Sequence, residues 1–301
     1  MHVFKNDGVT KIYRGEPLRD HLLGQVRKAL HGLSISVCVV QVGENPASNA
    51  YVARKLDACA KVGIDARVLK LDANDGEAKL HDVVRLLAAQ EDVRSIIVQT
   101  PLPVGWDVQA ALDLVPAYKD IDGLSRAGME LRRSGNAAAL LPATPLGVMR
   151  MLEALHVDVA GRKICVIGKG MVVGAPLREM LKAAGAEVIG IEKDTPHPAL
   201  LARECDVVIA AAGAPGLVTA EWVKHGAVVI DVGITRVDGK LLGDVNRASV
   251  DGIAGTVTPV PGGVGPMTVA SLLTNIADAT CLQLGRPRPR WTVDDMEPAT
   301  E

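Results

Sequence analysis

The sequence predicts an α/β protein with two domains, and three observations support this prediction. First, 301 residues are enough for about two domains with buried cores. Second, short apolar runs rich in β-branched residues alternate with longer segments of helical periodicity, an order typical of parallel sheets covered by helices. Third, this alternation occurs twice, on either side of a stretch of small and polar residues at 125–141, where we expect a linker.

The first set of elements has the order helix, then β-α-β-α-β. The opening helix is amphipathic, and Gly63 directly follows the next helix, at the position where glycine commonly ends one. Three strands linked by two helices predict a parallel sheet with helices on its faces. The expected elements are helix 16–31, strand 35–40, helix 46–62, strand 66–71, helix 76–90 and strand 95–99.

The second set begins after a helix expected at 145–155. Its strands are continuous apolar runs, the pattern of strands that are covered on both faces. A last helix follows Pro266 and runs to about residue 284, and the Pro-rich, charged stretch 286–301 predicts a flexible tail. The elements expected between these are strand 164–167, helix 172–184, strand 187–191, strand 206–211 and strand 227–232.

Composition argues against several classes of function. The 33 basic and 35 acidic residues give a net charge of −2, too weak a field to recruit nucleic acid or an anionic membrane. Aromatic residues make up 2%, which argues against base-stacking platforms. The five cysteines lie far apart and the seven histidines are scattered, so we expect reduced cysteines and no metal site. Because no apolar run has the length of a signal core or a membrane span, we expect a cytoplasmic protein.

A glycine-rich loop follows the first strand of the second set. Gly168, Gly170 and Gly174 are spaced Gly-x-Gly-x-x-x-Gly, one residue longer than the usual dinucleotide fingerprint. The first glycine would make the tight turn, and the N-terminus of the following helix would offer unpaired N–H groups to a pyrophosphate. The strand–turn–helix context favours a Rossmann-type nucleotide site over an ordinary βα turn.

The next strand ends at Glu192, 24 residues after Gly168. An acidic residue there normally accepts a hydrogen bond from the ribose 2′-hydroxyl of NAD. Lys169 and Lys193 could instead meet the 2′-phosphate of NADP. The local pattern therefore leaves both cofactors open.

Tyr51 and Lys55 lie four residues apart in the helix expected at 46–62 and therefore share one face. A lysine beside a phenol in a partly buried cleft can act as an acid or a base, although a surface lysine beside a half-buried tyrosine has the same pattern. Gln99 ends a strand, and Asp122 lies in a short polar segment. Polar groups at the carboxyl ends of parallel strands are where ligand sites form in such sheets.

The segment 259–268, Pro-Val-Pro-Gly-Gly-Val-Gly-Pro-Met-Thr, combines three prolines with three glycines. Proline fixes φ and glycine frees it, so the backbone is rigid, sharply bent and nearly without side chains. Such a loop can hold a flat ligand against the main chain, or it can be a structural turn between a strand and a helix.

Together, these residues resemble the methylenetetrahydrofolate dehydrogenase/cyclohydrolase family. The matching motifs occur in order over about residues 35–285, nearly the whole chain. They are Val42-Gly43 through Tyr51-Val52-x-x-Lys55, Val98-Gln99-x-Pro101-Leu102-Pro103, Lys119-Asp120-x-Asp122-Gly123, Pro142-x-Thr144-Pro145-x-Gly147, Ile230-Asp231-Val232-Gly233-Ile234 and the segment 259–268.

The resemblance implies two domains with a cleft between them, and a homodimer. An N-terminal three-layer α/β folate domain is expected at 1–142, to which the final helix at 267–285 returns, and a Rossmann-type NAD(P)-binding domain at 143–266. Two reactions are implied. 5,10-Methylenetetrahydrofolate loses a hydride to a nicotinamide cofactor, NADP by default with NAD as a rival, and the resulting 5,10-methenyl cation is hydrolysed to 10-formyltetrahydrofolate.

The resemblance also assigns roles to individual residues. Lys55 matches the catalytic lysine, Gln99 would hold it in place and favour its neutral form, and Tyr51 would stack near the folate. Asp122 would accept hydrogen bonds from the pterin's amino and ring N–H groups. The other expected contacts are with folate, from Val98, Thr100, Pro101, Pro261, Gly262, Gly263, Val264 and Gly265, and with the cofactor, from Gly168, Lys169, Gly170, Val173, Glu192, Lys193 and Ile234.

The chain departs from the usual family pattern near both ligands. Lys169-Gly170 replaces a polar pair such as Arg-Ser, and Glu192-Lys193 replaces a His-Ser-type segment, so a carboxylate stands where it would repel a 2′-phosphate. After Asp122 the usual Asn-x-Gly segment is absent. These differences leave open a NAD-preferring variant, a folate- or nucleotide-binding protein with weakened dehydrogenase activity, or a related α/β dehydrogenase acting on a small acid.

Overall fold

Two units, each with its own parallel sheet, make up the described chain. The computed structural model describes residues 9–293. The six-stranded unit comprises residues 9–20, 144–268 and 292–293 of these, and the three-stranded unit comprises residues 21–143 and 269–291. Three of the boundaries fall inside helices, namely α1 (Glu16–Ala29), α6 (Ala143–Ala154) and α10 (Val264–Gln283).

In the three-stranded unit, β2 (Ser36–Val42) is the central strand. β3 (Asp65–Leu71) and β4 (Val93–Gln99) pair with it in parallel, one on each side. The register places Gln41 opposite Gln99, so β2 and β4 end at the same edge of the sheet. This edge is where polar groups from neighbouring strands can meet.

Side chains of this sheet alternate between its two faces. Val40 of β2 and Val98 of β4 pack in one buried apolar cluster with α3 (Glu77–Ala89) and α4 (Val108–Asp113). Because consecutive residues of a strand point to opposite faces, Gln99 projects from the other face. The unit also contains α2 (Pro46–Lys61), α5 (Arg126–Arg133) and the 3-10 turn η1 (Ala73–Asp75).

The six-stranded unit has helices on both faces of its sheet. Its strands are β1 (Lys11–Ile12), β5 (Lys163–Ile167), β6 (Glu187–Ile191), β7 (Val207–Ala210), β8 (Val228–Asp231) and β11 (Thr256–Val257). Its other elements are α6 (Ala143–Ala154), α7 (Gly174–Ala183), α8 (Pro198–Arg203), α9 (Arg247–Val250), the 3-10 turn η2 (Ala220–Trp222) and the hairpin of β9 (Thr235–Val237) with β10 (Lys240–Leu242).

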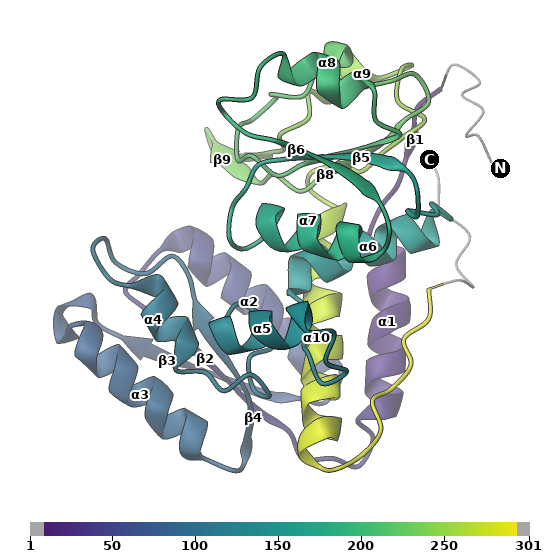
Figure 1. Cartoon of the computed structure of the whole chain (residues 1–301). Helices are drawn as coiled ribbons and strands as arrows, with labels where there is room; N and C mark the ends of the chain where they lie inside the picture. The colour runs from purple at the N-terminus through teal and green to yellow at the C-terminus, as the bar shows by residue number, and fades with distance from the viewer. Residues whose placement is uncertain (1–8, 294–301) are drawn as a thin grey trace. The chain divides into compact units, whose positions relative to one another are not determined.

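All neighbouring strands of this sheet are parallel, in the order β1-β11-β8-β7-β5-β6. Figure 1 shows β5, β6 and β8 between α6 and α7 on one side and α8 and α9 on the other. Every residue of β7 and β8 is buried, which explains why these strands are continuous apolar runs. The predicted α/β fold with parallel sheets is confirmed, including a Rossmann-type sheet in the second half of the chain.

Residues 9–20 belong to a different unit from the one expected. We expected residues 1–142 to form one domain, whereas β1 pairs with β11 at the edge of the six-stranded sheet. Lys11 N donates to the carbonyl of Gly255 at 3.0 Å, and Tyr13 N donates to that of Val257 at 2.9 Å. A strand of two residues is too short to show a period, so the sequence pattern did not reveal it.

Two short helices also differ from the prediction. The stretch 125–141, expected as a linker, contains α5, whose first turn is capped by Ser125 Oγ accepting from Gly128 N at 3.1 Å. The sequence analysis did not anticipate α4, which is capped by Asp107 Oδ1 accepting from Ala110 N at 3.0 Å. Helices of six and eight residues contain too few apolar positions to show a helical period.

The stretch 286–301, expected as a flexible tail, is described only in its first part. There Arg288 pairs with Asp278 of α10, and Trp291 Nε1 donates to Asp278 Oδ1 at 3.1 Å. These contacts hold residues 288–291 against that helix, in contrast to the flexibility expected for them. Residues 294–301 lie outside the described residues.

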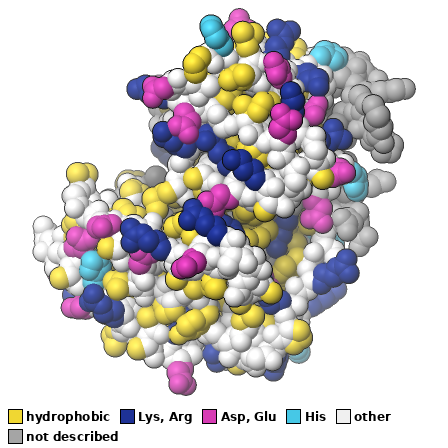
Figure 2. Space-filling model, in the orientation of Figure 1, with side chains coloured by type: hydrophobic (Ala, Val, Ile, Leu, Met, Phe, Trp, Pro, Cys, Tyr) yellow, Lys and Arg dark blue, Asp and Glu magenta, His cyan; other side chains and the backbone are white. Residues whose placement is uncertain are grey.

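Acidic and basic side chains are interspersed on the face shown in Figure 2, in keeping with the net charge of −2. Among residues 9–293, none of the helices combines the length and the hydropathy that a membrane span needs.

Candidate active site

Lys55 of α2 is the centre of a polar cluster in the three-stranded unit. Its Nζ lies 3.4 Å from Oε1 of Gln99, 3.8 Å from Oδ2 of Asp122 and 4.8 Å from the ring centroid of Tyr51. Only 4% of Lys55 is exposed, so its ammonium depends on these groups instead of on water. The structure thus brings together the four residues that were expected to form the catalytic set.

The helix α2 presents Tyr51 and Lys55 on one face, one turn apart. At its start, Asn45 Oδ1 accepts a hydrogen bond from Ser48 N at 3.1 Å, which caps the first turn. Burial, and after it the negative charge of Asp122, raises the pKa of Tyr51 above its ordinary value. The phenol therefore keeps its proton and can donate a hydrogen bond.

The end of β4 supplies Gln99 and its neighbours. Gln99 Nε2 donates to the carbonyl of Thr100 at 2.6 Å, which leaves the amide oxygen toward Lys55. The peptide bond between Thr100 and Pro101 is cis. Val98 was expected to contact the folate, but its side chain is buried in the apolar cluster with α3 and α4 and is not offered to a ligand.

A polar loop next to β4 places Asp122. Asp120 forms a parallel bridge with β4 and is itself buried. Its Oδ1 accepts from Gly123 N at 3.0 Å and its Oδ2 from Ser125 N at 2.7 Å, so one carboxylate holds the chain on the far side of Asp122. Gly123 has a φ of +66°, where glycine is favoured. The sequence analysis assigned a role to Asp122 and overlooked this role of Asp120.

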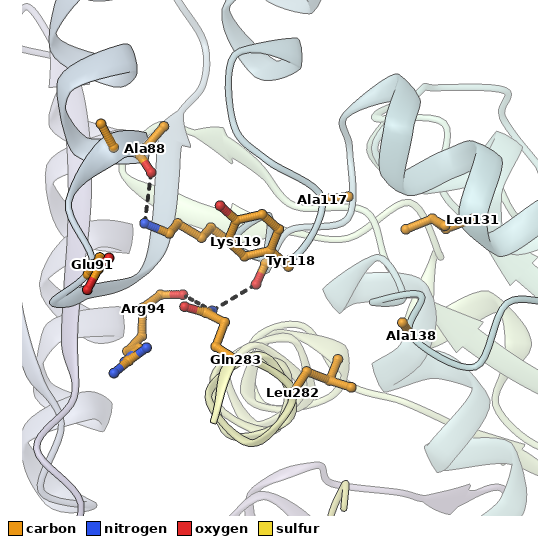
Figure 3. A pocket seen from close by; sticks show the side chains of 11 residues that line it. Ala88, Glu91, Arg94, Ala117, Tyr118, Lys119, Leu131, Ala138, Leu282 and Gln283 are labelled. Atoms are coloured by element: carbon orange, nitrogen blue, oxygen red, sulfur yellow. Dashed lines mark hydrogen bonds between the residues drawn. The ribbon is translucent and has the colours of Figure 1, made fainter. Parts of the chain in front are cut away.

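Lys119, from the same motif, is used at the other end of the sheet. Its Nζ donates to the carbonyl of Ala88 at 2.9 Å (Figure 3). It also donates to the carbonyl of Gln90 at 2.6 Å, so it supplies hydrogen-bond donors to carbonyls at the end of α3. A cavity of about 740 Å³ lies there, next to Arg94 at the start of β4. None of the residues expected to bind a ligand lines this cavity, so we place the candidate site at the opposite edge, around Lys55.

The glycine loop of the six-stranded unit leads from β5 into α7. Gly168 has a φ of +104°, and a Cβ at this position would lie 2.2 Å from the carbonyl oxygen of Ala211. A Cβ at Gly174 would lie 2.4 Å from the carbonyl oxygen of Gly168, whereas one at Gly170 would meet nothing within 4 Å. No side chain caps the first turn of α7. The loop therefore leaves backbone N–H groups open beside a space free of side chains, which fits the pyrophosphate of a dinucleotide.

Glu192 directly follows β6, the strand next to β5. Its Oε2 lies 2.5 Å from Nζ of Lys169, and its Oε1 accepts from NH1 of Arg178 at 3.1 Å. These two cations lower the pKa of Glu192 below its ordinary value, so the carboxylate is ionised. The sequence analysis did not identify Arg178. Gly190 was the available signal, because glycine inside a strand indicates that another group approaches closely.

The other expected cofactor contacts also lie in this unit. Val173 is half-buried before α7, Lys193 is exposed beside Glu192, and 53% of Ile234 is exposed after β8. Within residues 9–293, no group of three or more His, Cys, Asp or Glu side chains is arranged to hold a metal ion.

Two buried carboxylates hold the loops that follow β7 and β8. Asp231 accepts hydrogen bonds from three backbone N–H groups, at 2.9–3.1 Å, one of them that of Asp244. Asp244 Oδ2 accepts from the N–H groups of Ala212 and Gly213 at 2.6 and 2.9 Å. Burial raises the pKa of Asp231 to about 7.

The segment 259–268 lies at the end of the six-stranded unit, and α10 begins within it. The peptide bond between Val260 and Pro261 is cis, and Gly262 has a φ of +108°. Gly15 N donates to the carbonyl of Gly262 at 2.8 Å. The expected contact of folate with Pro261, Gly262, Gly263, Val264 and Gly265 stays a prediction.

Comparison with known proteins matches both halves of the chain to one family. Residues 14–122 match the model of the tetrahydrofolate dehydrogenase/cyclohydrolase catalytic domain, and residues 142–284 match that of the NAD(P)-binding domain. The chain is 42% identical over 246 residues to the bifunctional protein FolD of Lacticaseibacillus casei, covering 81% of this chain and 87% of that protein. It is 39% identical over 267 residues to the bifunctional protein FolD of Lysinibacillus sphaericus, covering 88% and 94%.

Solved structures agree with this match. The bifunctional methylenetetrahydrofolate dehydrogenase/cyclohydrolase FolD of Campylobacter jejuni superposes with a TM-score of 0.86 at 36% identity, covering 89% of this chain and 97% of that one. The FolD enzyme of Trypanosoma brucei, solved with NADP and an inhibitor, superposes with a TM-score of 0.87 at 32% identity, covering 92% and 99%. The chain therefore belongs to the tetrahydrofolate dehydrogenase/cyclohydrolase family.

Proposed function

We infer that this chain is a bifunctional enzyme of one-carbon metabolism. It oxidises 5,10-methylenetetrahydrofolate to the 5,10-methenyl form with a nicotinamide cofactor, and it hydrolyses that product to 10-formyltetrahydrofolate. The observation that carries the proposal is the buried Lys55, which lies within 3.8 Å of Gln99 and Asp122 and beside the ring of Tyr51. This intact cluster favours an active enzyme over a protein that only binds folate or nucleotide.

Hydrolysis requires water to add to the amidinium carbon, a ring C–N bond to break and protons to move between nitrogen and oxygen. Lys55 is the group that moves these protons, because its Nζ can exchange one while Gln99 holds it in place. Asp122, with 22% of its side chain exposed, accepts hydrogen bonds from the pterin's amino and ring N–H groups. Tyr51 packs beside the folate.

The oxidation takes place on a nicotinamide cofactor, which when bound accepts the hydride lost by the methylene carbon. The open N–H groups after Gly168 would hold its pyrophosphate. We propose NADP as the physiological cofactor. The Glu192 carboxylate was expected to repel a 2′-phosphate. In the structure it is paired with Lys169 and Arg178, so its negative charge is compensated. The relative from Trypanosoma brucei was solved with NADP, which supports the same choice.

A second candidate is an enzyme that prefers NAD. The observation in its favour is the position of Glu192 after β6, where an acidic residue normally accepts a hydrogen bond from the ribose 2′-hydroxyl. The ratio of kcat/KM for NADP to kcat/KM for NAD decides between the two. A homodimer and a role in purine biosynthesis stay predictions from the family resemblance, and a cytoplasmic location stays a prediction from the lack of a long apolar run.

Replacing Lys55 by methionine tests the central assignment. We expect the hydrolysis of methenyltetrahydrofolate, followed by the loss of its absorbance, to fall by a factor of about 10²–10⁴, the usual contribution of a positioned acid or base. Lys61→Met is the matched control, because Lys61 lies on the same helix with 61% of its side chain exposed. A Lys55→Met enzyme that hydrolyses methenyltetrahydrofolate at a rate near that of the wild type would show that Lys55 is not the proton carrier.

A further inference from the structure

Arg178 of α7 is the most extensively bonded cation beside the glycine loop. Its NH2 donates to the carbonyls of Val166, Gly168 and Ile191, at 3.2, 2.8 and 3.1 Å. Its NH1 donates to Oε1 of Glu192 at 3.1 Å. One guanidinium therefore ties together the ends of β5 and β6, the two strands that lead to the glycine loop and to Glu192.

The sheet leaves room for this guanidinium at Gly190. A Cβ added there would lie 2.5 Å from NH1 of Arg178 and 2.6 Å from its Cζ. Any other residue at position 190 would force the guanidinium away from the sheet. Arg178 is 17% exposed at its side chain, so its position is set by packing and by its four hydrogen bonds.

The two cations on Glu192 differ in how easily they can leave it. Lys169 is 69% exposed at its side chain, and an exposed ion pair contributes only about 0–1 kcal/mol, so Lys169 can exchange partners at little cost. Arg178 cannot leave without abandoning three backbone carbonyls as well. Glu192 therefore has one permanent partner and one exchangeable partner.

We propose that Arg178 is a positioning residue that sets the cofactor preference of this enzyme. It holds and neutralises Glu192, so that Lys169 can leave the carboxylate and bind the 2′-phosphate of NADP. Without Arg178, Lys169 would have to compensate Glu192 and the phosphate at once, and the carboxylate would repel the phosphate. This inference rests on the proposed use of NADP.

The test is the ratio of kcat/KM for NADP to kcat/KM for NAD in Arg178→Gln. We expect the ratio to fall about tenfold or more, the scale of one hydrogen bond to a charged group, mainly through a higher KM for NADP. Lys182→Gln, which removes an exposed charge from the same helix, is the matched control and should leave the ratio unchanged.

The double variant Arg178→Gln/Glu192→Gln separates positioning from a merely structural role. If Arg178 acts by neutralising Glu192, the double variant should have nearly the ratio of Glu192→Gln alone. If Arg178→Gln lowers kcat/KM equally for both cofactors, with or without Glu192, the arginine only supports the fold and the inference is wrong.

Gly190→Ala should displace the Arg178 guanidinium without removing its charge. This variant replaces Arg178→Gln in the test if Arg178→Gln does not fold. It should lower the ratio in the same direction, and an unchanged ratio in folded Gly190→Ala would contradict the inference. A wild-type enzyme that turns over NAD and not NADP would instead refute the proposed cofactor itself, before any variant is compared.

Discussion

Replacing Asp120 by alanine should lower the free energy of unfolding by about 1–3 kcal/mol. Its two carboxylate oxygens accept hydrogen bonds from Gly123 N at 3.0 Å and from Ser125 N at 2.7 Å. Asp120, Gly123 and Ser125 are all buried, and Gly123 N also donates to the backbone carbonyl of Asp120 at 3.1 Å, a bond that alanine keeps. Alanine would therefore leave one buried N–H group, that of Ser125, without its acceptor. A buried N–H that loses its acceptor costs about 1–3 kcal/mol, which is the stated range.

Urea unfolding followed by circular dichroism measures this change, and the midpoint and slope should be compared separately. Asp120→Asn is the matched control, because its amide oxygen can still accept from Ser125 N, so it should cost less than alanine. The alanine variant should also raise the KM for methylenetetrahydrofolate, since Asp122 lies within the loop that Asp120 holds. An alanine variant within about 0.5 kcal/mol of the wild type would refute the view that these two hydrogen bonds hold the loop.

Two further predictions concern the six-stranded unit. Gly168→Ala should destabilise the protein by about 1–3 kcal/mol or more and raise the KM for NADP. The reason is that the backbone has a φ of +104° and the new Cβ would lie 2.2 Å from the carbonyl oxygen of Ala211. Thermal melting and kinetics check this prediction, with Gly170→Ala as a control that should change stability little. Burial raises the pKa of Asp231 from 3.8 to about 7, so the folded state binds this proton more tightly than the unfolded state does. The protonated carboxyl therefore stabilises the folded state fully below about pH 4, and this stabilisation is lost as the pH rises from there through 7. The stability of the wild type relative to Asp231→Asn should accordingly fall by up to about 1.4 kcal/mol per pH unit across that window, and a constant difference would contradict the raised pKa.

Local patterns were sufficient to predict the order of the longer helices and of the main strands of both sheets. Apolar runs predicted the buried strands of both parallel sheets, and glycine spacing located the loop after β5. Helical spacing alone placed Tyr51 and Lys55 on one face. Gln99 and Asp122 were predicted to lie near them for two reasons. Polar groups meet at the carboxyl ends of parallel strands, and the family resemblance implies the same site. Short elements such as β1 and α4 were not predicted, because two to six residues are too few to show a hydrophobic period.

The sequence by itself therefore determined the fold class, the family and the residue types at both sites, because periodicity and motifs are properties of neighbouring residues. Only the tertiary structure decided which group each side chain meets. It showed that Glu192 pairs with Arg178 and Lys169 and that Gly190 leaves space for the arginine. It also showed that the carboxylate of the buried Asp120 holds the loop around Asp122 through two hydrogen bonds. The pairings of Glu192 depend on contacts between adjacent strands and helices, and on space left by a missing Cβ, which no spacing along the chain records.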